Sequence, residues 1–222
     1  IIERWNPVGI VVSGTIVRGD PAPSSDLDIY VIHTASWRQR VQLTFNGIPA
    51  EIFVNPPQMV ARYFEAERAA GRPITAHMLA TGFVVLNRDP VVDQIRAQAR
   101  DAMAVPPDPS AETLTIKRYM AAADFEDARD VVERTPATAA MILARATHTM
   151  LQYHFWSSNR YLPRDKDLFT ALRVTDAELA DLARAFYAAH DIHERVKIAE
   201  QIADRTIGTY GFFEWESTPE DV

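Results

Sequence analysis

Two aspartates near the N-terminus, Asp26 and Asp28, have a spacing that suits metal chemistry. They stand at the start of an apolar run, residues 27–32, that predicts a β-strand. Side chains at i and i+2 of a strand project from the same face. Two carboxylates fixed on rigid backbone are suitable ligands for Mg²⁺, which takes oxygen ligands in octahedral geometry. A third carboxylate, Glu51, lies within another apolar run and completes the set if its strand pairs beside that of Asp28.

A short turn of small residues, Ser13-Gly14-Thr15, follows an earlier β-branched run at residues 9–13. A glycine lets backbone N–H groups approach a phosphate closely, and a hydroxyl adds a further donor. Arg18 follows the turn by three residues, and a guanidinium can bind phosphate with two parallel hydrogen bonds. The turn and the carboxylates together predict a site that holds divalent ions against the phosphates of a nucleotide.

The order and spacing of these residues resemble the nucleotidyltransferase superfamily of DNA polymerase beta and kanamycin nucleotidyltransferase. That pattern is Gly-(Gly/Ser), about ten residues, Asp-x-Asp or Asp-x-Glu, and a third carboxylate on a later strand. Here Gly14-Thr15 precedes Asp26-Leu27-Asp28 by ten residues, and Glu51 is the candidate third acid. Thr15 stands where the family more often has Ser. The match covers residues 9–55, and the later part of the chain resembles the antibiotic-modifying members only in general build.

The resemblance implies a transferase that uses two Mg²⁺ ions and moves a nucleoside monophosphate, AMP from ATP, to a hydroxyl group. Asp26, Asp28 and Glu51 would hold the ions, while Ser13, Gly14, Thr15 and Arg18 would contact the phosphates. Two ions about 3.5–4 Å apart can clamp the attacking and the leaving oxygens of such a reaction. The implied acceptor is a hydroxylated small molecule such as an aminoglycoside.

The elements around these residues alternate between strands and helices. Asn46-Gly47 between two strand-like runs is a strong hairpin signal, because both residues accept positive φ. We expect strands at residues 9–13, 27–32, 38–45, 48–54 and 83–86, and helices at 56–70, 74–80 and 90–104. The resemblance implies that these elements make up a nucleotidyltransferase catalytic domain at residues 1–105.

The character of the chain changes after a proline-rich linker, residues 105–109. We expect only helices beyond it, at residues 110–133, 137–158, 175–190 and 192–207. Thr175 and Glu178 have the spacing of a capping box at a helix start. The predicted fold class is therefore α+β, a small mixed sheet with flanking helices followed by an all-α bundle at residues 110–222.

Two groups in the helical part are candidates for the site. Asp124, Glu126, Asp127 and Asp130 crowd one helix. In the antibiotic-modifying relatives a carboxylate of this domain acts as general base, and Asp127 is our choice among these acids. Lys166, one of three lysines, lies in a basic loop and would meet the triphosphate as a point charge. The alternatives remain a solvated acidic helix face and ordinary loop chemistry.

Composition narrows the class of protein. The net charge is −7 and there is no basic run, so nucleic acid is an unlikely partner. Without cysteine there are neither disulfides nor thiolate metal sites. No apolar run reaches the ~18 residues of a membrane span, so we expect a cytoplasmic protein without a membrane partner. The sequence begins with Ile1, and we expect further residues before it in the natural chain.

Two other functions fit the same residues. A minimal nucleotidyltransferase of the toxin–antitoxin type would modify a protein, although such enzymes are usually shorter than this chain. A non-catalytic nucleotide-binding protein would keep the fold with a weakened site, which the presence of all three carboxylates disfavours. The antibiotic-modifying relatives form active sites between subunits, so the resemblance also implies a possible homodimer.

Overall fold

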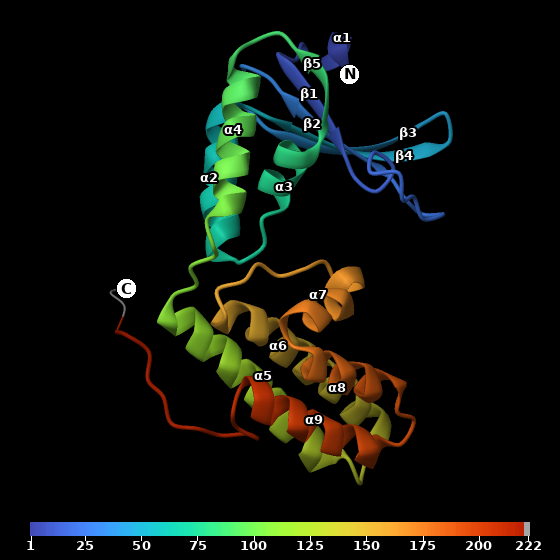
Figure 1. Ribbon diagram of the computed structural model, residues 1–222, viewed down its shortest axis with the longest axis vertical. Helices are drawn as coiled ribbons and strands as arrows, with labels where there is room; N and C mark the ends of the chain where they lie inside the picture. Colours follow the sequence, from blue (N-terminus) through green and yellow to red (C-terminus); the bar gives the residue numbers. More distant parts are fainter. Residues whose placement is uncertain (220–222) are drawn as a thin grey trace. The chain divides into compact units, whose positions relative to one another are not determined.

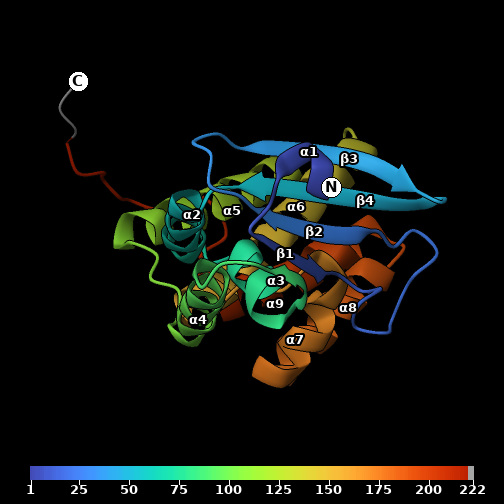
Figure 2. The ribbon, with the colours of Figure 1, turned by 90° about the horizontal axis from the view of Figure 1, so that it is seen from above.

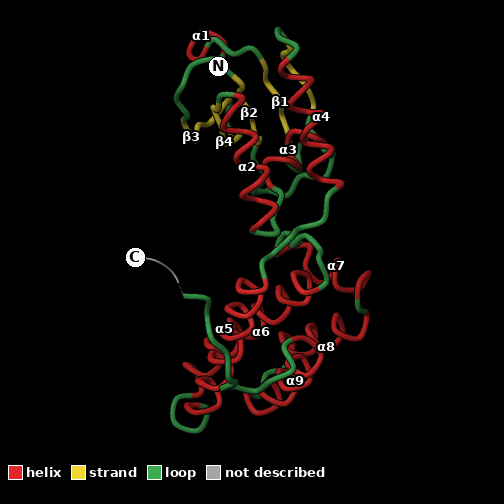
Figure 3. Tube along the Cα trace, turned by 90° about the vertical axis from the view of Figure 1, so that its left-hand side faces the viewer, coloured by secondary structure: helices red, strands yellow, loops and turns green. Residues whose placement is uncertain are grey.

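The fold is α+β, as the sequence predicts, and is described here from a computed structural model for residues 1–219. The chain divides into two compact units, residues 1–106 and the residues from 107 onward. Figure 1 shows the elements of each unit, and Figure 3 shows that the described strands all lie in the first.

The first unit is built on a mixed sheet with the strand order β3-β4-β2-β1-β5 (Figure 2). Its strands are β1 (Gly9–Ser13), β2 (Leu27–Ile32), β3 (Gln39–Phe45), β4 (Ile48–Asn55) and β5 (Phe83–Asn87). β2 and β4 pair in parallel, whereas the other neighbouring pairs are antiparallel. β3 lies between β2 and β4 in the chain, but in the sheet β4 is the direct neighbour of β2 and β3 is at the edge.

The hairpin of β3 and β4 forms as the sequence predicts. Asn46 has φ 49° and Gly47 has φ 83°, the positive values that a tight two-residue turn requires. The turn sets the register, so that Phe45 pairs with Ile48 and Gln42 with Glu51. A slip of one residue would move every side chain of the hairpin to the opposite face.

Helices α2 (Pro57–Ala69), α3 (Ile74–Thr81) and α4 (Val91–Ala104) pack against one face of the sheet (Figure 1). Their apolar residues form a core with alternate residues of the strands, among them Val11, Tyr30, Ile32, Val60, Leu79, Val92 and Ile95. On the opposite face, Trp5 of the short helix α1 (Ile2–Trp5) packs with Ile29, Val31, Ile52 and Val54. Burial on both faces makes the centre of the sheet a rigid platform.

The side chain of Glu67 on α2 caps the N-terminus of α3. Its carboxylate accepts hydrogen bonds from the Thr75 amide at 2.9 Å and 2.8 Å, and from the Ala76 amide at 3.4 Å. These are amides of the first turn of α3, which have no partner within the helix. Burial of the half-exposed carboxyl raises the pKa of Glu67 above its ordinary value of 4.5, although the hydrogen bonds oppose the shift.

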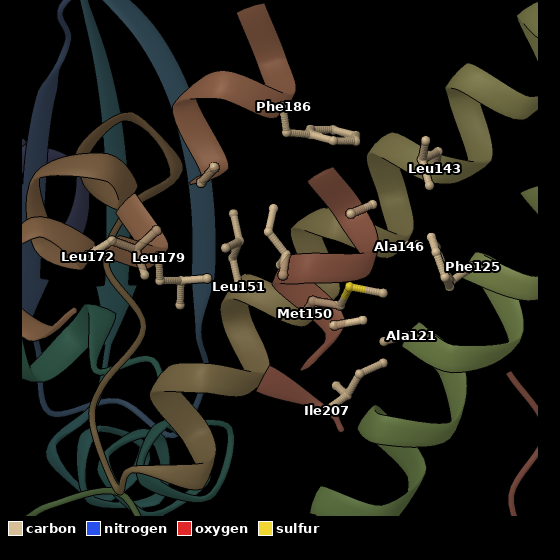
Figure 4. Packing of buried hydrophobic residues seen from close by; sticks show 14 of the residues in the cluster. Ala121, Phe125, Leu143, Ala146, Met150, Leu151, Leu172, Leu179, Phe186 and Ile207 are labelled. Carbon is tan, nitrogen blue, oxygen red and sulfur yellow. The ribbon is translucent and has the colours of Figure 1, made fainter. Parts of the chain in front are cut away.

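The second unit consists of α5 (Ala111–Val131), α6 (Pro136–Ser157), α7 (Leu168–Thr175), α8 (Ala177–Ala188) and α9 (Ile192–Thr206), with a 3₁₀ turn η1 (Asp165–Asp167) before α7. Their apolar faces meet in a single core (Figure 4). Leu143, Ala146 and Met150 of α6 are fully buried there, and Tyr153 packs against them. Among the described residues, no helix is long and apolar enough to cross a membrane.

The expected capping box at Thr175 is wrong. Thr175 is the last residue of α7, and its hydroxyl donates back to the carbonyls of Ala171 and Leu172. The N-cap of α8 is Asp176, whose carboxylate accepts from the Leu179 amide at 3.0 Å. Asp and Thr both cap helices, and here the charged side chain one residue later does so. The expected helix at residues 175–190 is thus α8, and α7 was not predicted.

We expect replacement of Glu67 by Gln to change how stability depends on pH. Above pH 4.5 the unfolded wild-type chain loses the Glu67 proton before the folded chain does. The free energy of unfolding of the wild type should therefore fall relative to that of Glu67→Gln as the pH rises through the raised pKa. Urea unfolding at a series of pH values measures this difference. The same series with Glu65→Gln, an exposed position on α2, is the control, and a flat difference for both variants would refute the prediction.

Truncation of Leu151 should destabilise the second unit. Leu151 is fully buried in its core, so Leu151→Ala leaves a cavity and should lower the free energy of unfolding by about 2–5 kcal/mol. Val174 is 83% exposed, and Val174→Ala should change the free energy of unfolding by less than about 0.5 kcal/mol. Thermal and urea denaturation of the two variants test this, and equal effects would show that the core described here is wrong.

Candidate metal and nucleotide site

The parallel pairing of β2 and β4 brings three carboxylates together. Asp28 pairs directly with Glu51 in the register of the two strands, and Asp26 lies just before β2. One carboxylate oxygen from each of the three residues lies within 4.8 Å of the others. Asp26 is exposed, while Asp28 and Glu51 are half-buried. The structure therefore groups the three acids that the sequence singles out.

The acids stand on the face of the sheet that the helices cover. Asp28 shares this face with Tyr30, and Glu51 shares it with Phe53, because strand residues alternate. Tyr30 and Phe53 are stacked with ring centroids 6.2 Å apart. Burial raises the pKa of Tyr30 well above its ordinary value, so this phenol remains neutral beside the acids. The apolar core thus ends where the acid cluster begins.

The predicted turn passes directly over the acids. Ser13 pairs with Asp28 across β1 and β2, and Gly14 follows with φ 99°. A Cβ on Gly14 would lie 3.0 Å from Asp28 Oδ2 and 3.3 Å from the carbonyl oxygen of Asp26. The glycine is therefore required both by its backbone conformation and by its approach to the carboxylate.

Thr15 and Arg18 continue this turn. The hydroxyls of Thr15 and Ser25 share a hydrogen bond of 2.7 Å, and the Ser25 oxygen also accepts from the Ala22 amide at 2.8 Å. Ser25 thereby ties the loop before Asp26 to the turn after β1. Arg18 is exposed, and its amide donates to the Gly14 carbonyl at 3.3 Å. A role of either side chain in phosphate binding stays a prediction.

Two residues of β3 that the sequence analysis did not single out contact the third acid. Arg40 Nε donates to Glu51 Oε1 at 2.6 Å and forms an ion pair with it, and Gln42 Nε2 donates to the same oxygen at 3.3 Å. The signal was present in the sequence. Counting back from the Asn46-Gly47 turn places Gln42 opposite Glu51 and Arg40 on the same face.

A pocket of about 510 Å³ opens beside the acids. Two of the carboxylates, Asp26 and Glu51, line this pocket. The other lining residues belong to β3 and β4, namely Gln42, Leu43, Thr44, Pro49 and Ala50. This volume lies in the range of small-molecule sites, about 300–1,000 Å³. The acids therefore face a space that can admit a ligand as well as an ion.

The candidates of the second unit lie on α5 and in η1. Arg145 holds Asp124 with two hydrogen bonds, of 2.8 Å and 2.6 Å, and Glu126 accepts from the Phe212 amide at 3.1 Å. Asp127 is exposed on α5, and Lys166 is exposed in η1. The bonds of Asp124 and Glu126 are structural. The roles of Asp127 and Lys166 remain predictions.

The donor set fits a hard divalent cation. Three carboxylates on adjacent backbone segments supply the oxygen ligands that Mg²⁺ and Mn²⁺ prefer, with neither thiolate nor imidazole among them. Asp26, Asp28 and Glu51 are the residues that would hold such an ion. Because Glu51 Oε1 already accepts two hydrogen bonds, Oε2 is the oxygen of Glu51 best placed to bind it.

Replacement of Gly14 by Ala should damage the site beyond its effect on stability. Gly14→Ala and Gly19→Ala both place a side chain at positive φ, so each should lower the free energy of unfolding by about 1–3 kcal/mol. A Cβ on Gly19 meets nothing within 4 Å, whereas a Cβ on Gly14 crowds Asp28. Titration with Mn²⁺ should therefore show weaker binding for Gly14→Ala alone. Equal affinities for the two variants would contradict this.

Comparison with known proteins supports the fold. No family model and no curated protein matches the sequence. Among solved structures, the chain is similar to a nucleotidyltransferase-like protein from Exiguobacterium sibiricum 255-15, with a TM-score of 0.54 and 14% identity over 91% of this chain and 71% of that one. The likeness is one of fold: the chain has a nucleotidyltransferase-like fold.

Proposed function

We propose that the protein is a metal-dependent nucleotidyltransferase that moves AMP from ATP to a hydroxyl group. The acceptor oxygen forms a bond with the α-phosphorus, and the bond from this phosphorus to the oxygen bridging to the β-phosphorus breaks. Pyrophosphate leaves with that oxygen, and the hydroxyl proton passes to a base. The observation that carries the proposal is the group of three carboxylates beside a glycine turn in a nucleotidyltransferase-like fold.

The chain's residues have distinct parts in this reaction. Asp26, Asp28 and Glu51 would hold the ions, which would neutralise charge on the phosphoryl oxygens. Because Asp28 and Glu51 stand on paired strands of the sheet, the backbone holds these two carboxylates beside each other for this role. The turn at Gly14 offers backbone amides to the phosphates. The hydroxyl of Thr15 gives up its hydrogen bond with Ser25 and donates to a phosphate oxygen instead.

The acceptor we propose is a hydroxylated small molecule such as an aminoglycoside. The pocket supports a polar acceptor, because the amide of Gln42 and the hydroxyl of Thr44 line it beside the two acids that would hold the ions. The net charge of −7 favours such a cationic acceptor over nucleic acid.

Pyrophosphate release tests the proposal. Each of the four common nucleoside triphosphates is incubated with Mg²⁺, the protein and a library of amino sugars. We expect release that depends on the acceptor, and a loss of at least about a hundredfold in Asp26→Asn/Asp28→Asn, because metal ligands supply several kcal/mol of transition-state stabilisation. Asp101→Asn/Asp181→Asn removes two exposed carboxylates elsewhere and should retain activity.

Other outcomes would replace the proposal. If nucleotide binds in a Mg²⁺-dependent manner but no small molecule accepts it, a protein acceptor takes the place of the amino sugar. If nucleotide binding is unaffected by Mg²⁺ and nothing turns over, the protein is a nucleotide-binding protein and not an enzyme. Activity that survives in Asp26→Asn/Asp28→Asn would refute the site.

A further inference from the structure

Arg40 places a positive charge on the third carboxylate of the cluster. Its guanidinium donates from Nε to Glu51 Oε1 at 2.6 Å, and the two side chains also form an ion pair. The guanidinium carbon lies 5.1 Å from the centre of the Phe53 ring, within the range of a cation–π contact. An acid and an aromatic ring of β4 therefore hold this charge on the pocket side of the hairpin.

The pairing of β3 with β4 explains this position. Arg40 is directly opposite Phe53, and Gln42 is directly opposite Glu51. Arg40 therefore reaches Glu51 diagonally on the same face, a distance that a long side chain can span. β3 lies at the edge of the sheet (Figure 2), and 66% of the Arg40 side chain is exposed. The guanidinium is thus held by contacts at its tip and has room to move away.

We propose that Arg40 is a built-in counter-cation that competes with a divalent ion for Glu51 and so weakens metal binding on that side of the cluster. This inference rests on the proposed metal site. It assigns to Arg40 a role opposite to that of a metal ligand. Without metal the arginine balances the charge of Glu51, and this contact has to be given up or shared when an ion binds.

Electrostatics gives the direction of the effect. A divalent ion bound by Glu51 lies close to a guanidinium that bonds to the same carboxylate, and the two positive charges repel each other. The guanidinium also occupies Oε1, which removes one of the two oxygens that Glu51 offers. Exposed ion pairs are individually weak, so a divalent ion at sufficient concentration can displace the arginine.

A second role for the same contact would have the opposite effect. If Arg40 acted only by orienting Glu51, its removal would loosen the carboxylate and weaken metal binding. Arg40→Gln separates these roles, because it removes the charge and leaves a shorter, neutral amide, so competition and orientation predict changes of opposite sign. Arg40→Lys separates them again, because it keeps the charge but loses the planar donor geometry of the guanidinium.

The test is a titration of the whole chain with Mn²⁺ alone, in which free Mn²⁺ is followed by electron paramagnetic resonance. We expect Arg40→Gln to bind the ion on the order of tenfold more tightly than the wild type, as removal of one neighbouring charge predicts. Arg40→Lys should remain close to the wild type. Added salt should reduce the difference between Arg40→Gln and the wild type, because it screens the repulsion.

Arg38→Gln is the matched control, since it removes an arginine that bonds to the Tyr63 hydroxyl at 2.6 Å and not to the acids. It should leave Mn²⁺ binding unchanged. Circular dichroism and thermal melting should confirm that the variants are folded. Affinity that is equal or weaker in Arg40→Gln, or equally raised in Arg38→Gln, would overturn the inference.

The titration also separates failure of this inference from failure of the proposed function. If the wild type binds Mn²⁺ and Asp26→Asn/Asp28→Asn does not, the metal site stands and Arg40→Gln alone decides the role of Arg40. If neither the wild type nor Arg40→Gln binds the ion at millimolar concentration, both the metal site and the inference are refuted. Binding by Arg40→Gln alone would be the strongest support.

Discussion

The parallel pairing of β2 with β4 is the contact on which the site depends. It places Asp28 beside Glu51, and Asp26 joins them from the residue before Leu27. Three carboxylates in such a small space repel one another, so the grouping does not stabilise the fold by itself. The strands are held in register by apolar residues further along, such as Ile52 and Val54, which are fully buried.

The remaining features of the site compensate for this concentration of charge in different ways. Gly14 brings backbone and not a side chain to Asp28, which leaves space on the pocket side. Arg40 supplies an opposite charge from the neighbouring strand. Stability is thus provided by the core, and the site is built at the border of that core.

Much of the first unit could be predicted from sequence because its signals are local. Asn46-Gly47 identifies the hairpin, and alternation of apolar residues identifies the strands. The placement of Glu51 beside Asp28 came from the family resemblance, since a parallel pairing between distant segments leaves no local pattern. The contact of Arg40 with Glu51 is not a local signal, because the partner of an exposed arginine depends on the register of β3 against β4.

The second unit shows where local signals mislead. Thr175 and Asp176 are both good capping residues, and sequence alone does not say which one begins the helix. The bond of Asp176 to the Leu179 amide and its contact with Arg205 on α9 favour the later start. Likewise, the acids of α5 look alike in sequence, yet Asp124 and Glu126 have separate structural partners.

The position of β3 at the edge of the sheet has a consequence for how such a protein can diversify. β3 contributes Gln42, Leu43 and Thr44 to the pocket, but this strand is mostly exposed, and Val41 is its residue that packs against a buried cluster. Substitutions on it alter the pocket wall while the strands that carry the aspartates stay unchanged. Selection can therefore change what this pocket wall offers to a ligand along one strand, while the strands that form the buried core stay as they are.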